Sequence, residues 1–243
     1  MKEFVRTLKQ TFQVHGKADI FSYIAVTAGG GIFGMLIAFC ILIFEKDSYG
    51  KIGAVLALVF GIILLFFGGI FSIQGEFNIA ISMGKVRKYF VPARYLEQVL
   101  NILVMLAVVM LINWLEGLVY PAICPQAVCE FDIDPLLHNV GALIGIIFGA
   151  PVLVLLFGAL LMRFSAKFFW VLWALWMVLF VGGPRFMSAI SKNPDSVSAR
   201  IGLKILDFAR GISPMQLAVT LILLAVVGFL VTAGLFRKQR VTL

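Results

Sequence analysis

The chain has 243 residues, of which 62% are hydrophobic and only 13% are charged, and its net charge is +8 at pH 7. Ordinary soluble domains carry about a quarter charged residues, so this composition excludes a soluble globular protein and indicates an integral membrane protein. Nearly all the basic residues lie at the ends of apolar segments. That placement favours contact with anionic lipid headgroups and does not require nucleic acid.

Residues 1–17 form the first predicted element, an interfacial helix on the cytoplasmic leaflet. At helical spacing its apolar side chains share one face, which comprises Phe4, Val5, Leu8 and Phe12. The opposite face comprises Lys2, Arg6, Lys9 and Gln13. This segregation is typical of a helix that lies among lipid headgroups. The alternative is a frayed tail beside the first membrane span.

Six apolar segments predict membrane-spanning α-helices, because about 20 helical residues cross a hydrocarbon core of about 30 Å. They are residues 21–44, 52–73, 97–120, 140–162, 168–183 and 214–236. The fifth segment is short for a complete span. The apolar runs are unbroken and show no alternation with a period of two, which favours a helical bundle over a β-barrel. The predicted fold is therefore an all-α integral membrane protein with six transmembrane helices.

The distribution of Lys and Arg among the connections predicts which side of the membrane each one faces. Basic residues concentrate in the N-terminal arm, in residues 85–94 and 163–167, and in the C-terminal tail, so these parts are predicted to be cytoplasmic. The connection at residues 121–139 contains three acidic residues and no Lys or Arg, so it is predicted to lie outside. Residues 185–212 are an exception, because the six-span order places them outside although they carry five basic residues.

The sequence GEFNIAISMGKVRKYFVPAR, residues 75–94, interrupts the apolar pattern between the second and third spans. As a connection it is expected to face water, yet it contains the apolar residues Phe77, Ile81 and Met83. Gly84 would permit a break between two short helical pieces. An exposed apolar patch beside basic residues predicts a docking element for a protein partner. The alternative is an ordinary cytosolic loop.

Two features near the outer end of the third span have more than one interpretation. Glu116 lies within the span. Such a carboxylate either faces the bundle interior, where it would line a translocation route, or reaches the headgroups. Cys124 and Cys129 lie in the predicted outer connection, where oxidising conditions would permit a disulfide. The alternative is two independent thiols.

Glycine is abundant in the predicted spans. It clusters in the sequence AGGGIFG of the first span and in FFGGIF of the second. In the fourth span Gly141, Gly145 and Gly149 recur every four residues and form one small-residue stripe. Such a stripe permits another helix to approach closely, so it predicts a tight contact within the subunit or with another subunit.

The chain carries no motif that indicates catalysis or metal binding. It lacks the phosphate-binding G-x-x-x-x-G-K-[ST], the zinc-binding H-E-x-x-H and the nucleophile motif G-x-S-x-G. His15 and His138 are predicted to lie on opposite sides of the membrane, so they cannot share a metal ion. We therefore expect no ATP hydrolysis by this chain, no other enzymatic activity and no resident cofactor.

The segment after the second span resembles the corresponding cytoplasmic segment of ABC-2-type permeases, the membrane subunits of one class of ABC exporters. The residues that carry the resemblance are Phe77, Ser82, Met83, Gly84, Arg87, Lys88 and Phe90. In that family the segment is a coupling helix that fits into a cleft of a separately encoded ATPase. The resemblance therefore implies that these residues, together with Ile81, contact an ATPase subunit. The family also has short re-entrant helices between its fifth and sixth spans, which would account for residues 185–212.

The same resemblance implies a mechanism of alternating access. Two permease subunits, identical or homologous, would enclose a route lined mainly by the first, second and fifth spans. Two ATPase subunits would bind ATP and magnesium and drive the change of access. The apolar chain suits an amphipathic or lipid-like cargo such as a peptide, a bacteriocin or a drug. The implied location is the bacterial cell membrane, with both termini in the cytoplasm.

The sequence alone is also compatible with two functions of other classes. The chain could be a membrane subunit that binds a small molecule for import, or a scaffold with no role in transport. An adjacent gene for an ATPase with a phosphate-binding loop, and a gene for a second six-span protein, would favour the exporter. A gene standing alone would favour the other two functions.

Overall fold

The fold is that of a computed structural model, which describes Val5 and residues 16–44, 48–82, 87–164, 166–178 and 214–238. Among these residues four helices are long and apolar enough to cross a membrane. They are Lys17–Phe44, Ile52–Ser82, Tyr89–Ile123 and Val140–Phe164. Two shorter apolar helices are Lys167–Met177 and Ile222–Phe236. These helices indicate a multi-pass membrane protein, and the arrangement with six complete spans stays a prediction.

Two predicted elements fall largely or wholly outside the described residues. Of the expected interfacial helix at residues 1–17, only Val5, Gly16 and Lys17 are described. The expected outer segment at residues 185–212 is not described at all. Both therefore stay predictions.

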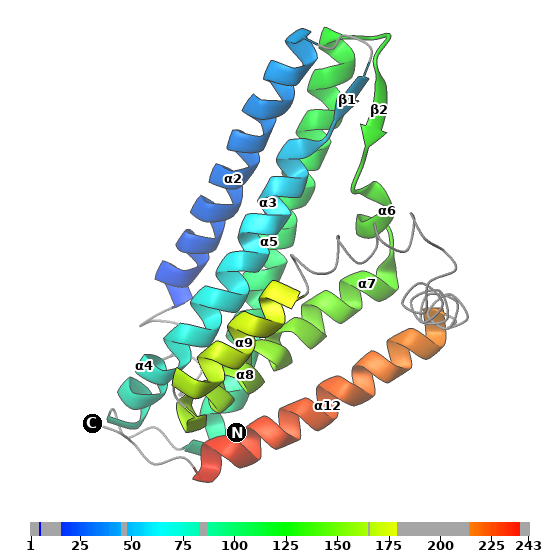
Figure 1. The fold of residues 1–243 in the computed structure, drawn as a ribbon. Coiled ribbons are helices and arrows are strands. Elements are labelled where there is room, and N and C mark those ends of the chain that lie inside the picture. Colours follow the sequence, from blue (N-terminus) through cyan, green and yellow to red (C-terminus); the bar gives the residue numbers. More distant parts are fainter. Residues whose placement is uncertain are drawn as a thin grey trace.

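The first half of the chain forms three long helical rods that lie side by side (Figure 1). The first rod, α2 (Lys17–Phe44), leads through strand β1 (Ser48–Gly50) to α3 (Ile52–Ile63). α3 continues through the π-helical turn η2 (Leu64–Gly68) into α4 (Gly69–Ser82), so the second rod is one helix of 31 residues. The third rod is α5 (Arg87–Ile123). Helices suit a lipid environment because each one satisfies its own backbone hydrogen bonds.

Helices α8 (Ala150–Phe164) and α12 (Pro214–Lys238) of the second half pack against α4 and α5, whereas the strand that opens this half lies at the other end of the rods (Figure 1). Strand β2 (Val128–Phe131) and the short α6 (Asp134–Leu137) precede α7 (Val140–Ile144), whose first turn is capped by the side chain of Asn139. α7 continues through the π-helical turn η3 (Gly145–Gly149) into α8. α9 (Ala166–Met177) follows, and α12 packs along α8.

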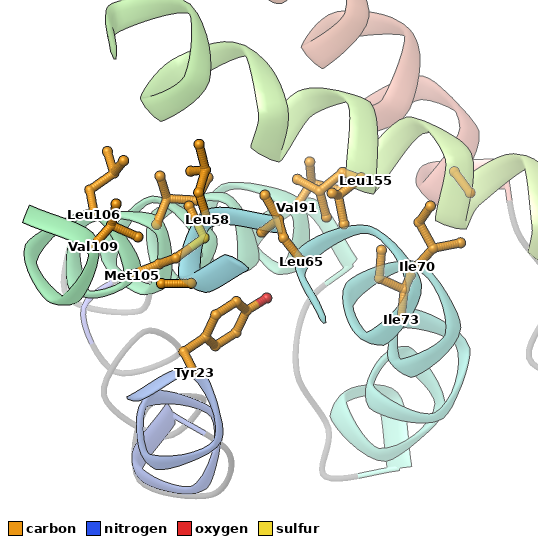
Figure 2. Close-up of a cluster of buried hydrophobic side chains, with 14 of the residues drawn as sticks. Tyr23, Leu58, Leu65, Ile70, Ile73, Val91, Met105, Leu106, Val109 and Leu155 are labelled. Atoms are coloured by element: carbon orange, nitrogen blue, oxygen red, sulfur yellow. The ribbon is translucent and has the colours of Figure 1, made fainter. Parts of the chain in front are cut away.

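The hydrophobic core lies where the second and third rods meet α2 and α8. Leu58 and Leu65 from the second rod pack with Met105 from α5 and Leu155 from α8 (Figure 2). The ring of Tyr23 on α2 joins the same cluster (Figure 2). The core therefore includes helices from both halves of the chain.

The closest helix contact is between α2 and α3, and glycine is required there. A Cβ atom at Gly34 would lie 2.7 Å from the Cα atom of Gly53 and 2.7 Å from the carbonyl oxygen of Ile52. One at Gly53 would lie 2.7 Å from Glu116 Oε1. Small residues therefore let these two backbones approach closely, as small-residue contacts do in membranes.

Within the described residues, Gly141 and Gly149 of the predicted stripe make no comparable contact with another helix. A Cβ atom at Gly149 would meet nothing within 4 Å, and one at Gly141 would meet only Oδ1 of the nearby Asn139. A tight contact inside the subunit is therefore not found at these two positions among the described residues. A contact of the stripe with another subunit stays a prediction.

Most of residues 75–94 continue the helices on either side of them, and the cytosolic location of this segment stays a prediction. α4 continues without a break to Ser82, and α5 begins at Arg87. α4 and α5 form a helical hairpin, and the residues that connect them, 83–86, lie outside the described residues. The helices that contain the predicted spans 52–73 and 97–120 extend beyond them through polar residues, and the bounds of the spans stay predictions.

Two connections that were expected to be loops pair as short parallel strands. Ser48 of β1 lies opposite Val128 of β2, and the Lys51 backbone N–H extends the pairing by donating to the Phe131 carbonyl at 2.9 Å. The fold is otherwise all-α within the described residues. The strand pair ties the α2–α3 connection to the chain after α5, at the end of the molecule away from α4 (Figure 1).

Candidate functional site

The aromatic residues predicted to dock a partner lie in the protein core. Phe77 is fully buried and Phe90 is buried, and their ring centroids are 5.3 Å apart. Each ring also lies 5.3 Å from that of Phe236 near the end of α12. The expectation that Phe77 is an exposed apolar anchor is therefore wrong. The physical reason is that α12 supplies a third ring, which encloses the two rings of the α4–α5 hairpin.

The other predicted docking residues lie closer to the turn of the hairpin. Ile81 is half-buried and packs against the core, and Ser82 is exposed, with its hydroxyl donating to the Ile79 carbonyl at 2.8 Å. The remaining four have no described side chains: Met83, Gly84, Arg87 and Lys88. Contact between this turn and an ATPase stays a prediction.

A buried ion-pair cluster joins α2, α4 and α5 about two helical turns beyond the start of α5. Arg94 is only 2% exposed, and it binds Glu76 through Nε–Oε2 at 2.7 Å and Nη2–Oε1 at 2.8 Å. Its Nη1 atom lies 3.0 Å from Asp19 Oδ2 and 2.8 Å from Glu97 Oε2. We call these four residues the Arg94 cluster. One guanidinium thus holds three helices together, since paired two-point contacts are the strongest that Arg makes.

The sequence pattern predicts Arg94 only as one of the basic residues of the segment 85–94, and this cluster was not predicted. Glu76, Arg94 and Glu97 are charged residues within helices that continue from apolar spans, and Arg94 and Glu97 have the i, i+3 spacing of neighbours on one helix face. That spacing could have suggested a buried pair. The contributions of Glu76 and Asp19 depend on helix packing, which no local pattern reveals.

A line of buried polar side chains continues from the Arg94 cluster into the bundle. Gln98 and Asn101 lie on the same face of α5 as Arg94, at i+4 and i+7. Both are fully buried, and their amide groups have no hydrogen-bond partner among the described residues. The hydroxyl of Thr27 on α2 is also buried without a described partner. Buried groups of this kind are normally satisfied by a partner or by ordered water, so each calls for an explanation.

An apolar cavity of about 530 Å³ lies between the second helical rod and α9. Every residue that lines it is hydrophobic, and seven of the twelve are aromatic. The rod contributes Ile62, Ile63, Phe66, Phe67, Ile70 and Phe71, α8 contributes Phe157, and α9 contributes Phe169, Leu172, Trp173, Leu175 and Trp176. The volume is within the range of sites that bind small molecules.

The π-helical turn η2 forms part of the wall of this cavity. Phe66 and Phe67, which are consecutive, both lie in η2 and both line the cavity. The ring centroid of Phe71 is 5.9 Å from that of Phe169, so the rod and α9 are also in contact across it. Single π-helical turns inside α-helices frequently occur at functional sites and at bends. The wall of the cavity therefore coincides with the irregular part of the second rod.

Glu116 caps the N-terminus of α3 from the neighbouring helix. Its Oε1 atom accepts hydrogen bonds from the Gly53 N–H and the Tyr120 hydroxyl, and its Oε2 atom accepts one from the Ala54 N–H, each at 2.8 Å. The side chain is fully buried. A carboxylate at a helix N-terminus satisfies N–H groups that have no partner within the helix and complements the helix dipole. A role for Glu116 in lining a route stays a prediction.

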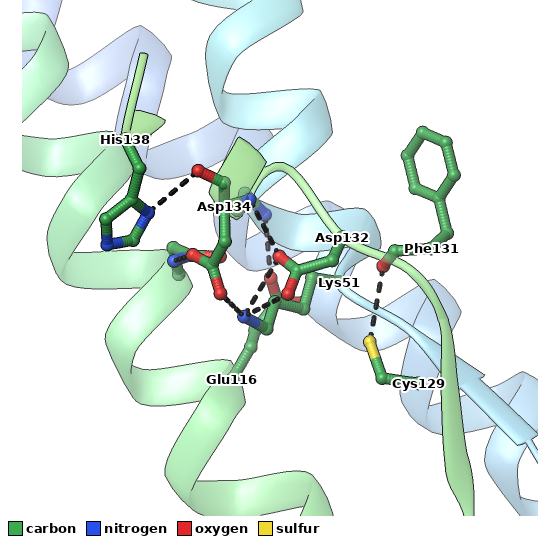
Figure 3. A network of polar contacts seen from close by, with 9 residues as sticks. Lys51, Glu116, Cys129, Phe131, Asp132, Asp134 and His138 are labelled. Atoms are coloured by element: carbon green, nitrogen blue, oxygen red, sulfur yellow. Dashed lines mark hydrogen bonds and ion pairs between the residues drawn. The ribbon is translucent and has the colours of Figure 1, made fainter. Parts of the chain in front are cut away.

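A second polar network surrounds Lys51 at the same end of the molecule (Figure 3). The ammonium group is almost buried and lies 3.0 Å from Asp132 and 2.7 Å from Asp134. Asn113 of α5 donates to Asp134 at 2.6 Å. Burial lowers the pKa of Lys51, but the hydrogen bonds to Asp134 and Asp132 outweigh burial and raise that pKa above its ordinary value. The hydrogen bonds from Lys51 and Asn113 lower the pKa of Asp134 to about 2.

This network predicts a loss of stability in acid. Because the pKa of Asp134 is lower in the folded protein than in the unfolded chain, its stabilising effect is complete above about pH 4 and is lost between about pH 4 and about pH 2. We expect the unfolding temperature of the purified protein to fall over that interval. The fall should be smaller for Asp134→Asn, which has no carboxylate to protonate. Parallel curves for the two proteins between pH 4 and pH 2 would contradict this assignment.

The three cysteines are free thiols in the structure. Cys124 and Cys129 are half-buried, and the Cys129 thiol lies 3.5 Å from the Phe131 carbonyl oxygen (Figure 3). Burial raises the pKa of the Cys129 thiol, so the unreactive thiol form is favoured. A disulfide between the two residues stays a prediction.

Comparison with known proteins does not assign this chain to a family. Neither protein-family models, nor curated proteins, nor solved structures match this chain. Among the described residues no group of three or more His, Cys, Asp and Glu side chains could hold a metal ion. The candidate site is therefore defined by its own described residues, which are those of the apolar cavity and of the Arg94 cluster.

Proposed function

We propose that this chain is the permease subunit of an ABC exporter, and that it moves an amphipathic or lipid-like cargo with energy from a separate ATPase. One observation carries the proposal. A single helical rod, Ile52–Ser82, connects the turn that resembles an ABC-2-type coupling segment to the wall of the apolar cavity. The cavity lies between the second rod and α9, which correspond to the second and fifth predicted spans. In the family that the sequence resembles, these spans line the route.

The chemistry of the cavity supports a hydrophobic cargo. The lining of the cavity exposes almost no polar atoms, so it favours apolar groups over a hydrogen-bonding group or an anion. A polar group placed there would lose its contacts with water without replacement, at a cost of about 2 kcal/mol or more. An aliphatic chain or an aromatic ring would instead pack on Phe66, Phe71 and Trp173. The polar part of an amphipathic cargo would remain outside the cavity.

The Arg94 cluster supplies a means to transmit movement. In this proposal an ATPase subunit pushes on the turn of the α4–α5 hairpin when it binds ATP and magnesium. Arg94 connects α5 to Glu76 on α4 and to Asp19 on α2, so the three helix ends would move together. The displacement would reach the cavity along α4, and η2 offers the irregular turn at which the rod can bend. A second permease, identical or homologous, would complete the route in the membrane.

The proposal predicts that a separate ATPase copurifies with this chain through the hairpin turn. We expect the double charge reversal Arg87→Glu and Lys88→Glu to reduce the recovered ATPase by about tenfold or more, because like charges at an interface cost several kcal/mol. The matched control is Arg163→Glu with Lys167→Glu, at the junction of α8 and α9, where both side chains are exposed. The ATPase would be identified by mass spectrometry and measured by its ATP turnover.

Three results would count against the exporter. The first is ATP turnover by the purified chain alone, and the second is the absence of any ATPase from the purified complex. The third is equal loss of ATPase in both double variants, because that result would indicate a general effect of charge and not a docking site. An unfolding temperature within about 2 °C of the unmodified protein is required of each variant.

A further inference from the structure

The Arg94 cluster contains more potential negative charge than positive charge. Arg94 is the one cation among the described members, and three carboxyl groups surround it: Asp19, Glu76 and Glu97. The exposed fraction of the side chain is 30% for Asp19, 10% for Glu76 and 1% for Glu97. With all three ionised, the cluster would carry a net charge of −2 in a place that water hardly reaches. Charge of that kind is not tolerated in a protein interior without a compensating partner.

The geometry separates the roles of the three carboxyl groups. Glu76 accepts a hydrogen bond from Nη2 at 2.8 Å, and its other oxygen lies 2.7 Å from Nε in an ion pair, so both of its oxygens face the guanidinium, as in an ionised pair. Asp19 and Glu97 share the remaining nitrogen, Nη1, at 3.0 Å and 2.8 Å. When two carboxyl groups share one site, one of them tends to keep its proton, because the second negative charge is opposed by the first. Asp19 is the better hydrated of the two, so Glu97 is the member for which a charge costs more.

The surroundings of Glu97 also favour the protonated form of its side chain. Neither of its oxygens receives a directed hydrogen bond among the described residues, although Oε2 lies against the guanidinium. An ionised carboxylate that is 1% exposed would need several donors, whereas a neutral carboxyl group needs one acceptor for its proton. Gln98 is adjacent and Asn101 is one turn further along α5, and both have buried amide oxygens without a described partner. This side of α5 therefore carries two amide oxygens that can accept a hydrogen bond, and one carboxyl group without a described hydrogen-bond partner.

We propose that Glu97 is a proton-binding site, and that the folded protein holds a proton on its Oε1 atom at neutral pH. Oε2 then remains an acceptor facing Arg94 Nη1, and the cluster carries one negative charge less. Among the described residues, the ionisable groups that face Glu97 are Asp19 and Tyr23 on α2, Glu76 on α4 and Arg94 on its own helix. The proposal does not depend on the proposed function. Since the proton lies where three helices meet, movement of α2 away from α5 would hydrate Glu97 and release it.

The first experiment detects the proton directly. Infrared spectra of the purified protein at pH 7.5 would be compared with spectra of Glu97→Gln. We expect the variant to lack one carbonyl band of a protonated carboxyl group, a band that shifts in D₂O. Loss of a pair of carboxylate bands instead would show that Glu97 is ionised and would overturn the proposal.

The second experiment uses the sign of a change in stability. Glutamine has the shape of a protonated glutamate, so Glu97→Gln should leave the unfolding temperature at pH 7.5 unchanged or higher. The matched control is Glu76→Gln, which breaks the two-point contact and should lower the unfolding temperature by about 4 °C or more. If Glu97 is instead an ionised partner of Arg94, Glu97→Gln should lower the unfolding temperature as Glu76→Gln does.

The dependence on pH and on sodium completes the test. A proton that the folded state binds and the unfolded state does not must make stability fall as pH rises. We therefore expect the advantage of Glu97→Gln over the unmodified protein to grow between about pH 6 and about pH 9. Replacing choline chloride by sodium chloride at constant ionic strength should leave the unfolding temperature of both proteins unchanged. If sodium raises the unfolding temperature of the unmodified protein alone, the bound ion is Na⁺, and the assignment to a proton is overturned.

Discussion

Arg94→Met is expected to lower the free energy of unfolding by about 3–5 kcal/mol, the largest effect of any single substitution considered for this protein. Methionine fills a similar space but leaves Asp19, Glu76 and Glu97 without their shared cation. Removing one partner of a buried ion pair costs more than the pair itself contributes, because the remaining charges lose their only compensation. Protonation of Glu97 would reduce this cost but would not remove it, since Glu76 keeps its charge in the native cluster.

The measurement is the unfolding temperature of the purified protein in detergent. For a chain of this size 1 kcal/mol corresponds to roughly 2–4 °C, so a shift of about 6 °C or more is expected. Arg163→Met is the matched control, because Arg163 is exposed and its described contact is with the ring of Phe164 at 5.7 Å. An exposed contact between a cation and a ring is worth about 0.5–1 kcal/mol. Equal shifts for the two variants would mean that Arg94 does not hold the helices together.

Gly34→Ala is expected to destabilise the protein by about 1–3 kcal/mol, although alanine is normally the better helix former. The new methyl group would lie 2.7 Å from the Gly53 Cα atom and 2.7 Å from the Ile52 carbonyl oxygen. Both neighbours are backbone atoms, so the strain cannot be relieved by turning a side chain. α2 and α3 would have to move apart, and Glu116 would lose part of its contact with the N-terminus of α3.

Gly29→Ala is the control for this substitution, because it lies on the same helix and a Cβ atom there would meet nothing within 4 Å. We expect its unfolding temperature to equal or slightly exceed that of the unmodified protein. Both variants would be compared by thermal unfolding and by the fraction that remains monodisperse after heating. A similar loss in both would indicate an effect on insertion or helix propensity and not on the contact between α2 and α3.

The membrane-spanning character of the chain could be read from the sequence alone. An apolar run of about 20 residues is a local property, and its meaning in lipid does not depend on neighbouring segments. The four helices that the structure identifies as candidate spans coincide with the first four predicted segments. The helices extend beyond those segments, because α4 and α5 continue through Glu76 and Arg94, whose charges are compensated across the bundle. A count of apolar residues stops at the first charge.

What only the tertiary structure decided is which side chains face one another. Phe77 is an apolar residue in a polar segment, which predicts an exposed anchor for a partner. In the structure, however, rings from α5 and α12 enclose it. Glu116 could have faced a route or the headgroups, and it caps α3 because the start of that helix lies beside it. The Arg94 cluster draws Asp19 from a helix 75 residues away in the chain. Apolar burial depends on composition and period, whereas a charged or polar contact depends on the position of a second group, and that position is set by the packing of the whole bundle.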